Sequence, residues 1–241
     1  MEELLEKLET DYYGSEGKKY LSNSDIGTLL KDPTNFKKDR EPTLAMLQGS
    51  YFHTAMLEPH LLDNFQVIEC ASRNTKMYKE ELQESGEDML LLEKERQALD
   101  KLVSAMKENF DFYSLIYAEG NTYEQAAIKK IGGEMWKGKA DIITPGQVVD
   151  LKTTSNIDDF RYSARKYNYD SQAWIYNQLF GKAMVFLVIE KNTHRMGLFE
   201  CSDNFLEQGK EKVHRALEVY RRYYGKNPSD NVTQFYINQT L

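Results

Sequence analysis

Two carboxylates on consecutive predicted strands restrict the fold of this chain more than any other feature. Residues 135–143 predict a strand that carries Asp141 near its end. The Thr-Pro-Gly-Gln sequence at 144–147 is typical of a tight turn, and residues 147–152 predict the returning strand. The chain is therefore expected to contain a hairpin with Asp141 on one strand and Asp150 on the other.

The returning strand places an acid and a base on the same face. Residues two apart on a strand point in the same direction, so Asp150 and Lys152 project together, while Val149 and Leu151 pack on the opposite side. Mg²⁺ prefers carboxylate and water oxygens, so Asp141 and Asp150 together with a phosphate oxygen could hold it. Such a site would be suited to phosphodiester chemistry.

The acid-x-Lys triplet is by itself a weak signal. It also occurs at residues 16–18, in a polar N-terminal stretch, and a surface ion pair at a strand end would explain Asp150 and Lys152 equally well. If the site is catalytic, Lys152 could orient or deprotonate the attacking water, or stabilise the charge that develops on the phosphate. The rest of the chain has to decide between these interpretations.

Two further patterns lie upstream and downstream of the hairpin. Gly49 and His53 are four residues apart in an apolar segment, and Gln172 and Tyr176 have the same spacing in a helix predicted at about 158–180. His53 could be a buried, hydrogen-bonded histidine, and the Gln-Tyr pair could be half-buried packing. Beside the two carboxylates, a metal-binding role for His53 is favoured.

Taken together, these patterns resemble the RecB-type branch of the PD-(D/E)XK nuclease superfamily, and most of all the phage and prophage exonucleases of the RecE (exonuclease VIII) kind. The resemblance includes Tyr20-Leu-Ser-Asn-Ser-Asp-Ile-Gly-Thr-Leu-Leu30, followed by Asp32-Pro33 and Phe36-Lys37, and continues to about Tyr224. It therefore covers most of the chain.

The resemblance implies a role for each motif residue. Asp141 and Asp150 would bind metal, Lys152 would be the catalytic lysine, and His53 would be a further metal ligand. Gln172 and Tyr176 would border the site and contact DNA or orient the catalytic groups. Glu124 corresponds to an additional acid that such proteins often carry before the first core strand.

The resemblance also implies a substrate, a cofactor and partners. It predicts a Mg²⁺-dependent exonuclease, with Mn²⁺ able to substitute, that acts on the ends of linear double-stranded DNA. Cleavage from the 5′ end would leave a 3′ single strand for a single-strand annealing recombinase, and the chain would assemble into a homo-oligomeric ring. An enzyme of this kind would work in the cytoplasm of a bacterial host cell.

Composition restricts these expectations further. The two cysteines, Cys70 and Cys201, are too few for the four-cysteine iron–sulfur cluster of some related nucleases, and they fit an intracellular chain. No apolar run is long enough to span a membrane.

The formal net charge of −7 is unusual for a protein that binds a phosphate backbone. Local basic segments could compensate, above all residues 161–169, whose three bases and three tyrosines could follow a DNA strand by charge and stacking. DNA contacts are therefore expected at Arg161, Arg165 and Lys166. A solvated helix face is the alternative for this segment.

The order of predicted elements favours an α/β fold with a central mixed sheet flanked by helices. Residues 1–115 are expected to be mainly helical, with a long helical stretch at 76–110, and 120–225 to form the catalytic core of a single nuclease domain. Residues 183–190 and 195–201 predict paired strands, and 203–224 a final helix.

Two other functions remain open at this point. The same core could act as an endonuclease or a structure-specific nuclease, or it could be a non-catalytic DNA-binding module that retains the fold. The sequence contains neither a P-loop nor a G-x-S-x-G motif, so it offers no support for nucleotide hydrolysis or an esterase.

Overall fold

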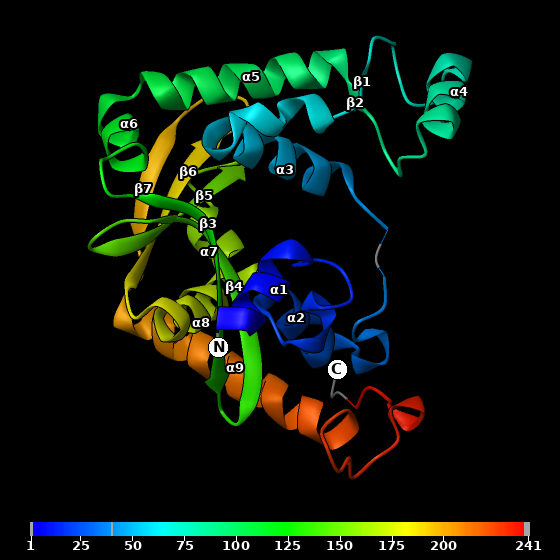
Figure 1. The fold of residues 1–241 in the computed structure, drawn as a ribbon, viewed down its shortest axis with the longest axis vertical. Helices are drawn as coiled ribbons and strands as arrows, with labels where there is room; N and C mark the ends of the chain where they lie inside the picture. The colour runs from blue at the N-terminus through cyan, green and yellow to red at the C-terminus, as the bar shows by residue number, and fades with distance from the viewer. Residues whose placement is uncertain (1, 40, 239–241) are drawn as a thin grey trace.

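The computed structural model describes residues 2–39 and 41–238 and contains a five-stranded mixed sheet (Figure 1). The strand order is β3-β4-β5-β6-β7; β5 and β6 are parallel, and the other neighbouring pairs are antiparallel. These strands are β3 (Thr122–Ile131), β4 (Glu134–Ile143), β5 (Gln147–Thr154), β6 (Ala183–Glu190) and β7 (Met196–Glu200). The expected α/β fold with a mixed central sheet is confirmed.

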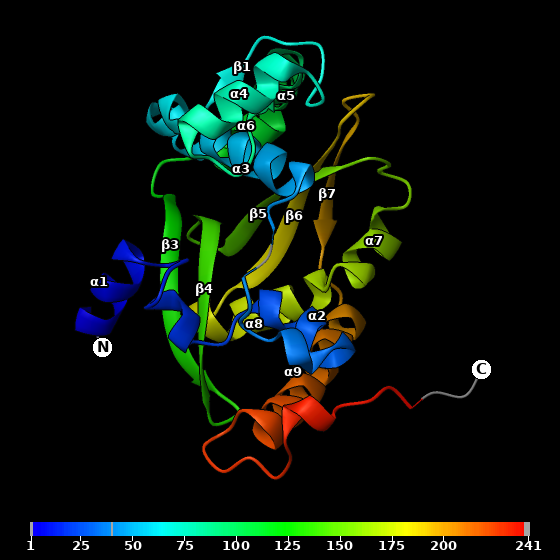
Figure 2. The same cartoon turned by 90° about the vertical axis from the view of Figure 1, so that its right-hand side faces the viewer.

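Helices cover both faces of the sheet (Figure 2). One layer consists of α3 (Leu44–Leu57), α5 (Glu93–Glu108) and α6 (Phe110–Ile116). The other contains α2 (Asn23–Lys31), α7 (Phe160–Lys166), α8 (Tyr169–Phe180) and α9 (Asp203–Tyr223). Helix α1 (Glu2–Thr10) packs on β3, while α4 (Lys76–Ser85), β1 (Val67–Ile68) and β2 (Leu91–Leu92) form a small projection at one end of α5. The short 3-10 helices are η1 (Gly17–Lys19), η2 (Pro33–Asn35), η3 (Pro59–Asn64) and η4 (Val232–Gln234).

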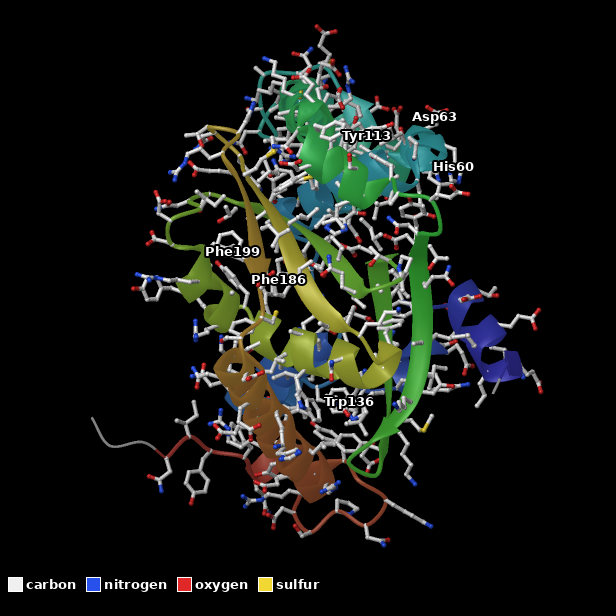
Figure 3. All side chains as sticks on the ribbon, turned by 90° about the vertical axis from the view of Figure 1, so that its left-hand side faces the viewer. His60, Asp63, Tyr113, Trp136, Phe186 and Phe199 are labelled. Atoms are coloured by element: carbon white, nitrogen blue, oxygen red, sulfur yellow. The ribbon has the colours of Figure 1, made fainter. Side chains whose placement is uncertain are left out.

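The alternation of side chains along β5 and β6 divides the interior into two cores. Phe186, labelled in Figure 3, packs toward α7 and α8, whereas Val149 and Leu151 pack against α3 and α5. Because successive strand residues point to opposite faces, Asp150 and Lys152 lie on the α8 side. This orientation agrees with the expectation from the sequence.

The single helix predicted at 158–180 is wrong, because the chain forms α7 and α8 with a break between them. Asn168 at the break has a φ of 60°, in the left-handed region. This conformation interrupts the helical hydrogen-bond ladder, and Asn adopts it more readily than most residues. Neither Gly nor Pro marks the break in the sequence.

The continuous helical stretch predicted at 76–110 is also divided. Gly86 ends α4 with a φ of 70°, and β2 then precedes α5. Glycine adopts this left-handed conformation without a steric penalty, which explains why the helix stops there.

Among the described residues, no helix has the length and apolar character needed to cross a membrane.

A buried lysine connects the N-terminal segment to the sheet. The Lys137 side chain on β4 is 7% exposed, and its ammonium donates to the backbone oxygen of Tyr12 and lies 4.0 Å from the centre of the Tyr12 ring. Burial lowers the pKa of Lys137 to about 8. The folded state therefore binds this proton less tightly than the unfolded chain does.

We expect the free energy of unfolding to increase with pH because of Lys137. Between the folded pKa and the unfolded value of 10.5, unfolding takes up a proton, so raising the pH favours the folded state. The gain should be about 1–2 kcal/mol between about pH 7 and pH 9.5, and Lys137→Met should remove it. Urea unfolding at both pH values measures the effect. Lys130→Met, at an exposed position of β3, is the control, and an unchanged pH dependence in Lys137→Met would contradict the assignment.

Candidate metal centre

The two aspartates lie where β4 and β5 separate. The β4–β5 ladder extends from the turn as far as the pair formed by Ile142 and Val149. Beyond this pair, Asp141 Oδ2 accepts a hydrogen bond from the backbone N–H of Leu151 at 2.8 Å. The Asp141 carboxylate therefore replaces a backbone carbonyl of β4 as the acceptor for this N–H of β5. Asp150 lies in the same opening between the two strands.

His53 and Glu124 join Asp141 from two other elements. His53 Nδ1 on α3 is 3.2 Å from Asp141 Oδ2. Glu124 on β3 lies opposite Asp141, because its two neighbours pair with the residues that flank Asp141 on β4. Each of the three side chains offers one ligand atom, and these atoms all lie within 4.8 Å of one another. Glu124 has a φ of 52°, a left-handed backbone conformation that is unusual inside a strand and costs about 1–3 kcal/mol.

Asp150 and Lys152 form a buried pair beside this group. Asp150 is 2% exposed; its Oδ1 accepts a hydrogen bond from Gln172 Nε2 at 2.6 Å, and its Oδ2 contacts the Lys152 ammonium. The Lys152 Nζ lies 4.9 Å from the centre of the Tyr169 ring. Gln172 and Tyr169 both belong to α8, so this helix fixes the geometry of the pair.

Tyr176 positions α8 against β4 through a hydrogen bond to the backbone. Its hydroxyl donates to the backbone oxygen of Lys139 at 2.8 Å. A Cβ on Gly138 would come within 2.5 Å of Leu179 and 3.0 Å of Tyr176, so a larger residue there would force these side chains to shift. The Lys139 ammonium is 2.6 Å from Glu124 Oε2, which ties Glu124 to the same strand.

Burial and neighbouring charges shift the pKa values of the two aspartates and the lysine in different directions. Burial raises the pKa of Asp141, but His53, Lys152 and the Leu151 N–H outweigh it and hold the pKa below its usual value. Burial raises the pKa of Asp150, and the nearby Asp141 adds to the effect. For Lys152, burial lowers the pKa, but the two aspartates together raise it above normal, so the side chain remains an ammonium.

The donor set fits a divalent cation. Carboxylate oxygens from Glu124 and Asp141 and an imidazole nitrogen from His53 suit Mg²⁺ or Mn²⁺. Asp150 Oδ2 is buried and receives no regular hydrogen bond from the described residues beyond its ion-pair contact with Lys152, so it retains acceptor capacity. Burial raises the pKa of Glu124, and a bound cation would favour its charged form.

The three bases expected to contact DNA do not line one common hollow. Arg161 lies 4.7 Å from the centre of the Tyr162 ring, and Arg165 donates to Gln208 on α9 at 3.0 Å. Both arginines line a small hollow beside β7 and α9, away from the acidic group. Lys166, by contrast, lies in a hollow between α7 and α2.

A mixed sheet between helices, with an acid at the end of one strand and Asp-x-Lys on the next, defines a PD-(D/E)XK-like nuclease fold. The family described as "PDDEXK-like domain of unknown function (DUF3799)" matches residues 19–228. The chain belongs to this family, and its expected membership of the PD-(D/E)XK superfamily is confirmed. No curated protein matches the sequence.

Solved structures support the fold. A protein from Eubacterium rectale, provisionally described as an exonuclease, is similar with a TM-score of 0.63 and 21% identity, over 87% of this chain and 85% of that one. A phage-related exonuclease from Haemophilus somnus 129PT matches with a TM-score of 0.37 and 14% identity, over 84% of this chain and 94% of that one. The first match shows a shared fold, whereas the second is too distant to support an argument.

Proposed function

We propose that the chain is a metal-dependent exonuclease that hydrolyses phosphodiester bonds at the ends of linear double-stranded DNA. The observation that carries this proposal is the convergence of His53, Glu124 and Asp141 within 4.8 Å, next to the buried Asp150–Lys152 pair. A cation-binding group of two acids and a histidine, next to an ammonium that is held by an ion pair, is suited to a reaction that builds negative charge on a phosphate.

Each side chain has a distinct task in this centre. His53, Glu124 and Asp141 would hold the cation, with Asp150 contributing from the neighbouring strand. A bound Mg²⁺ or Mn²⁺ would polarise the phosphate and lower the pKa of a coordinated water. Lys152, held between Asp150 and the Tyr169 ring, would balance the charge that develops on the phosphate oxygens.

The finer features of the proposal come from the family resemblance. These are Mg²⁺ as the metal, degradation from 5′ to 3′, and a 3′ single-stranded product that is passed to an annealing recombinase in phage-type recombination. A ring of several copies would bring the scattered basic residues of a chain with net charge −7 around one DNA. The similarity to the Eubacterium rectale protein supports the exonuclease class.

A digestion time course tests the proposal. Linear duplexes labelled at one 5′ or one 3′ end, and a covalently closed circular duplex, are incubated with Mg²⁺, Mn²⁺ or a chelator. We expect progressive loss of the 5′ label from linear DNA with either metal, and no reaction with the chelator. Cleavage of the closed circle would indicate an endonuclease instead. A chain that binds DNA but degrades none with either metal would be a non-catalytic module.

A further inference from the structure

Two hollows in the surface share Tyr167 in their linings, and the first of them begins at the metal centre. The first has a volume of about 560 Å³ and extends from His53 and Lys152 along α3 toward the α7–α8 junction. The second, of about 450 Å³, lies between that junction and α2. Tyr167 is 57% exposed and lines both, so it stands between the two hollows, which are together called here the strand path.

Three lysines that line the strand path have no carboxylate partner among the described residues. Lys191 borders the first hollow, and Lys31 and Lys166 border the second. None of the three forms an ion pair with a residue that the structure describes. Asp32 also borders the second hollow, but both its oxygens accept hydrogen bonds within η2. The path therefore offers positive charge to a ligand, although the chain as a whole is acidic.

An aromatic platform stands at the junction of the hollows. The Tyr167 ring centre is 6.2 Å from that of Tyr169, and the Lys166 ammonium is 5.6 Å from the Tyr167 ring centre. Tyr169 in turn lies beneath Lys152 at the metal centre. Exposed aromatic rings beside cations bind nucleobases by stacking, and they do so for any base because every base has a π-face.

We propose that the strand path binds unpaired nucleotides of a DNA strand, with Tyr167 stacked on a base and Lys31, Lys166 and Lys191 contacting phosphates. This proposal depends on the proposed nuclease function for one point only, namely that the bound strand reaches the metal centre. Hollows of this size suit a few nucleotides of a single strand. The chain would then hold a separated strand beside the centre, with the paired duplex outside.

The test compares two exposed tyrosines five positions apart in the chain. Tyr167 and Tyr162 are 57% and 60% exposed, but Tyr162 lines neither hollow. Fluorescence anisotropy with a labelled single-stranded oligodeoxythymidine, in chelator so that nothing is hydrolysed, gives the dissociation constant. Tyr167→Ala should raise it about tenfold or more, whereas Tyr167→Phe and Tyr162→Ala should leave it near the wild-type value.

The outcomes separate this proposal from the nuclease function. Equal affinities of Tyr167→Ala and Tyr162→Ala, or no binding of the oligonucleotide by the wild-type protein, would overturn the strand path whether or not the protein cuts DNA. If binding depends on Tyr167 but no DNA is hydrolysed with Mg²⁺ or Mn²⁺, the strand path stands and the nuclease proposal fails. If Tyr167→Ala weakens binding of a blunt duplex but not of the single-stranded oligonucleotide, that result would also count against the strand path.

Discussion

Replacing Asp150 by asparagine should lower the rate of metal-dependent DNA hydrolysis about 10²–10³-fold or more while the protein remains folded. Asparagine keeps the Oδ1 acceptor for Gln172 but removes the charge that would contribute to cation binding. Lys152 remains near the charged Asp141, so the substitution does not leave an isolated buried cation. Initial rates on end-labelled linear duplex, measured with Mg²⁺ and with Mn²⁺, give the effect.

Alanine at position 150 would be a less informative change. Unlike asparagine, it would leave the Gln172 amide without its acceptor, and an unsatisfied buried polar group destabilises a protein by about 1–3 kcal/mol. Lost activity could then reflect unfolding. Asp158→Asn is a suitable control, because Asp158 is exposed and pairs with Arg195 at the surface. If Asp150→Asn cleaves DNA at the wild-type rate with an unchanged melting temperature, Asp150 has no catalytic role.

The sequence predicted the sheet well where local pattern and tertiary packing agree. The apolar, β-branched run at 183–190 coincides with β6, because this strand is buried on both faces by the two helical layers. The helix break at Asn168 could not be predicted in this way. A left-handed asparagine in the middle of a helical pattern depends on tertiary contacts, such as the hydrogen bond from Asn23 Nδ2 to the Asn168 carbonyl.

The part of the candidate site that depends on the spacing of residues within one strand was predictable from the sequence. Asp150 and Lys152 share a face because they are two apart on a strand, and the structure places them together. The position of Glu124 depends on its register opposite Asp141 and on a positive φ, neither of which is visible in the sequence. Tyr169 was expected only as part of the 161–169 segment; its place under Lys152 was not predicted, because it depends on the break before α8.

Gly49 gives a second large effect, which an alanine and a phenylalanine substitution test through stability and through activity. It lines the first hollow from α3, and a Cβ added there would meet no atom within 4 Å. Glycine inside a helix is less stable than alanine by about 0.5–1 kcal/mol, so packing does not explain its presence here. Gly49→Ala should therefore raise the free energy of unfolding by about this amount, measured by urea denaturation.

A larger side chain at the same position should block the hollow. Gly49→Phe should lower DNA hydrolysis about 10²-fold, because a ring there would displace a strand bound next to Lys152. Ser50→Phe is the matched control, since Ser50 is the next residue of α3, is exposed and lies outside the lining of the hollow. Its rate should stay near that of the wild-type protein. Equal rates for the two phenylalanine variants would show that the substrate does not pass through this hollow, even if Asp150→Asn is inactive.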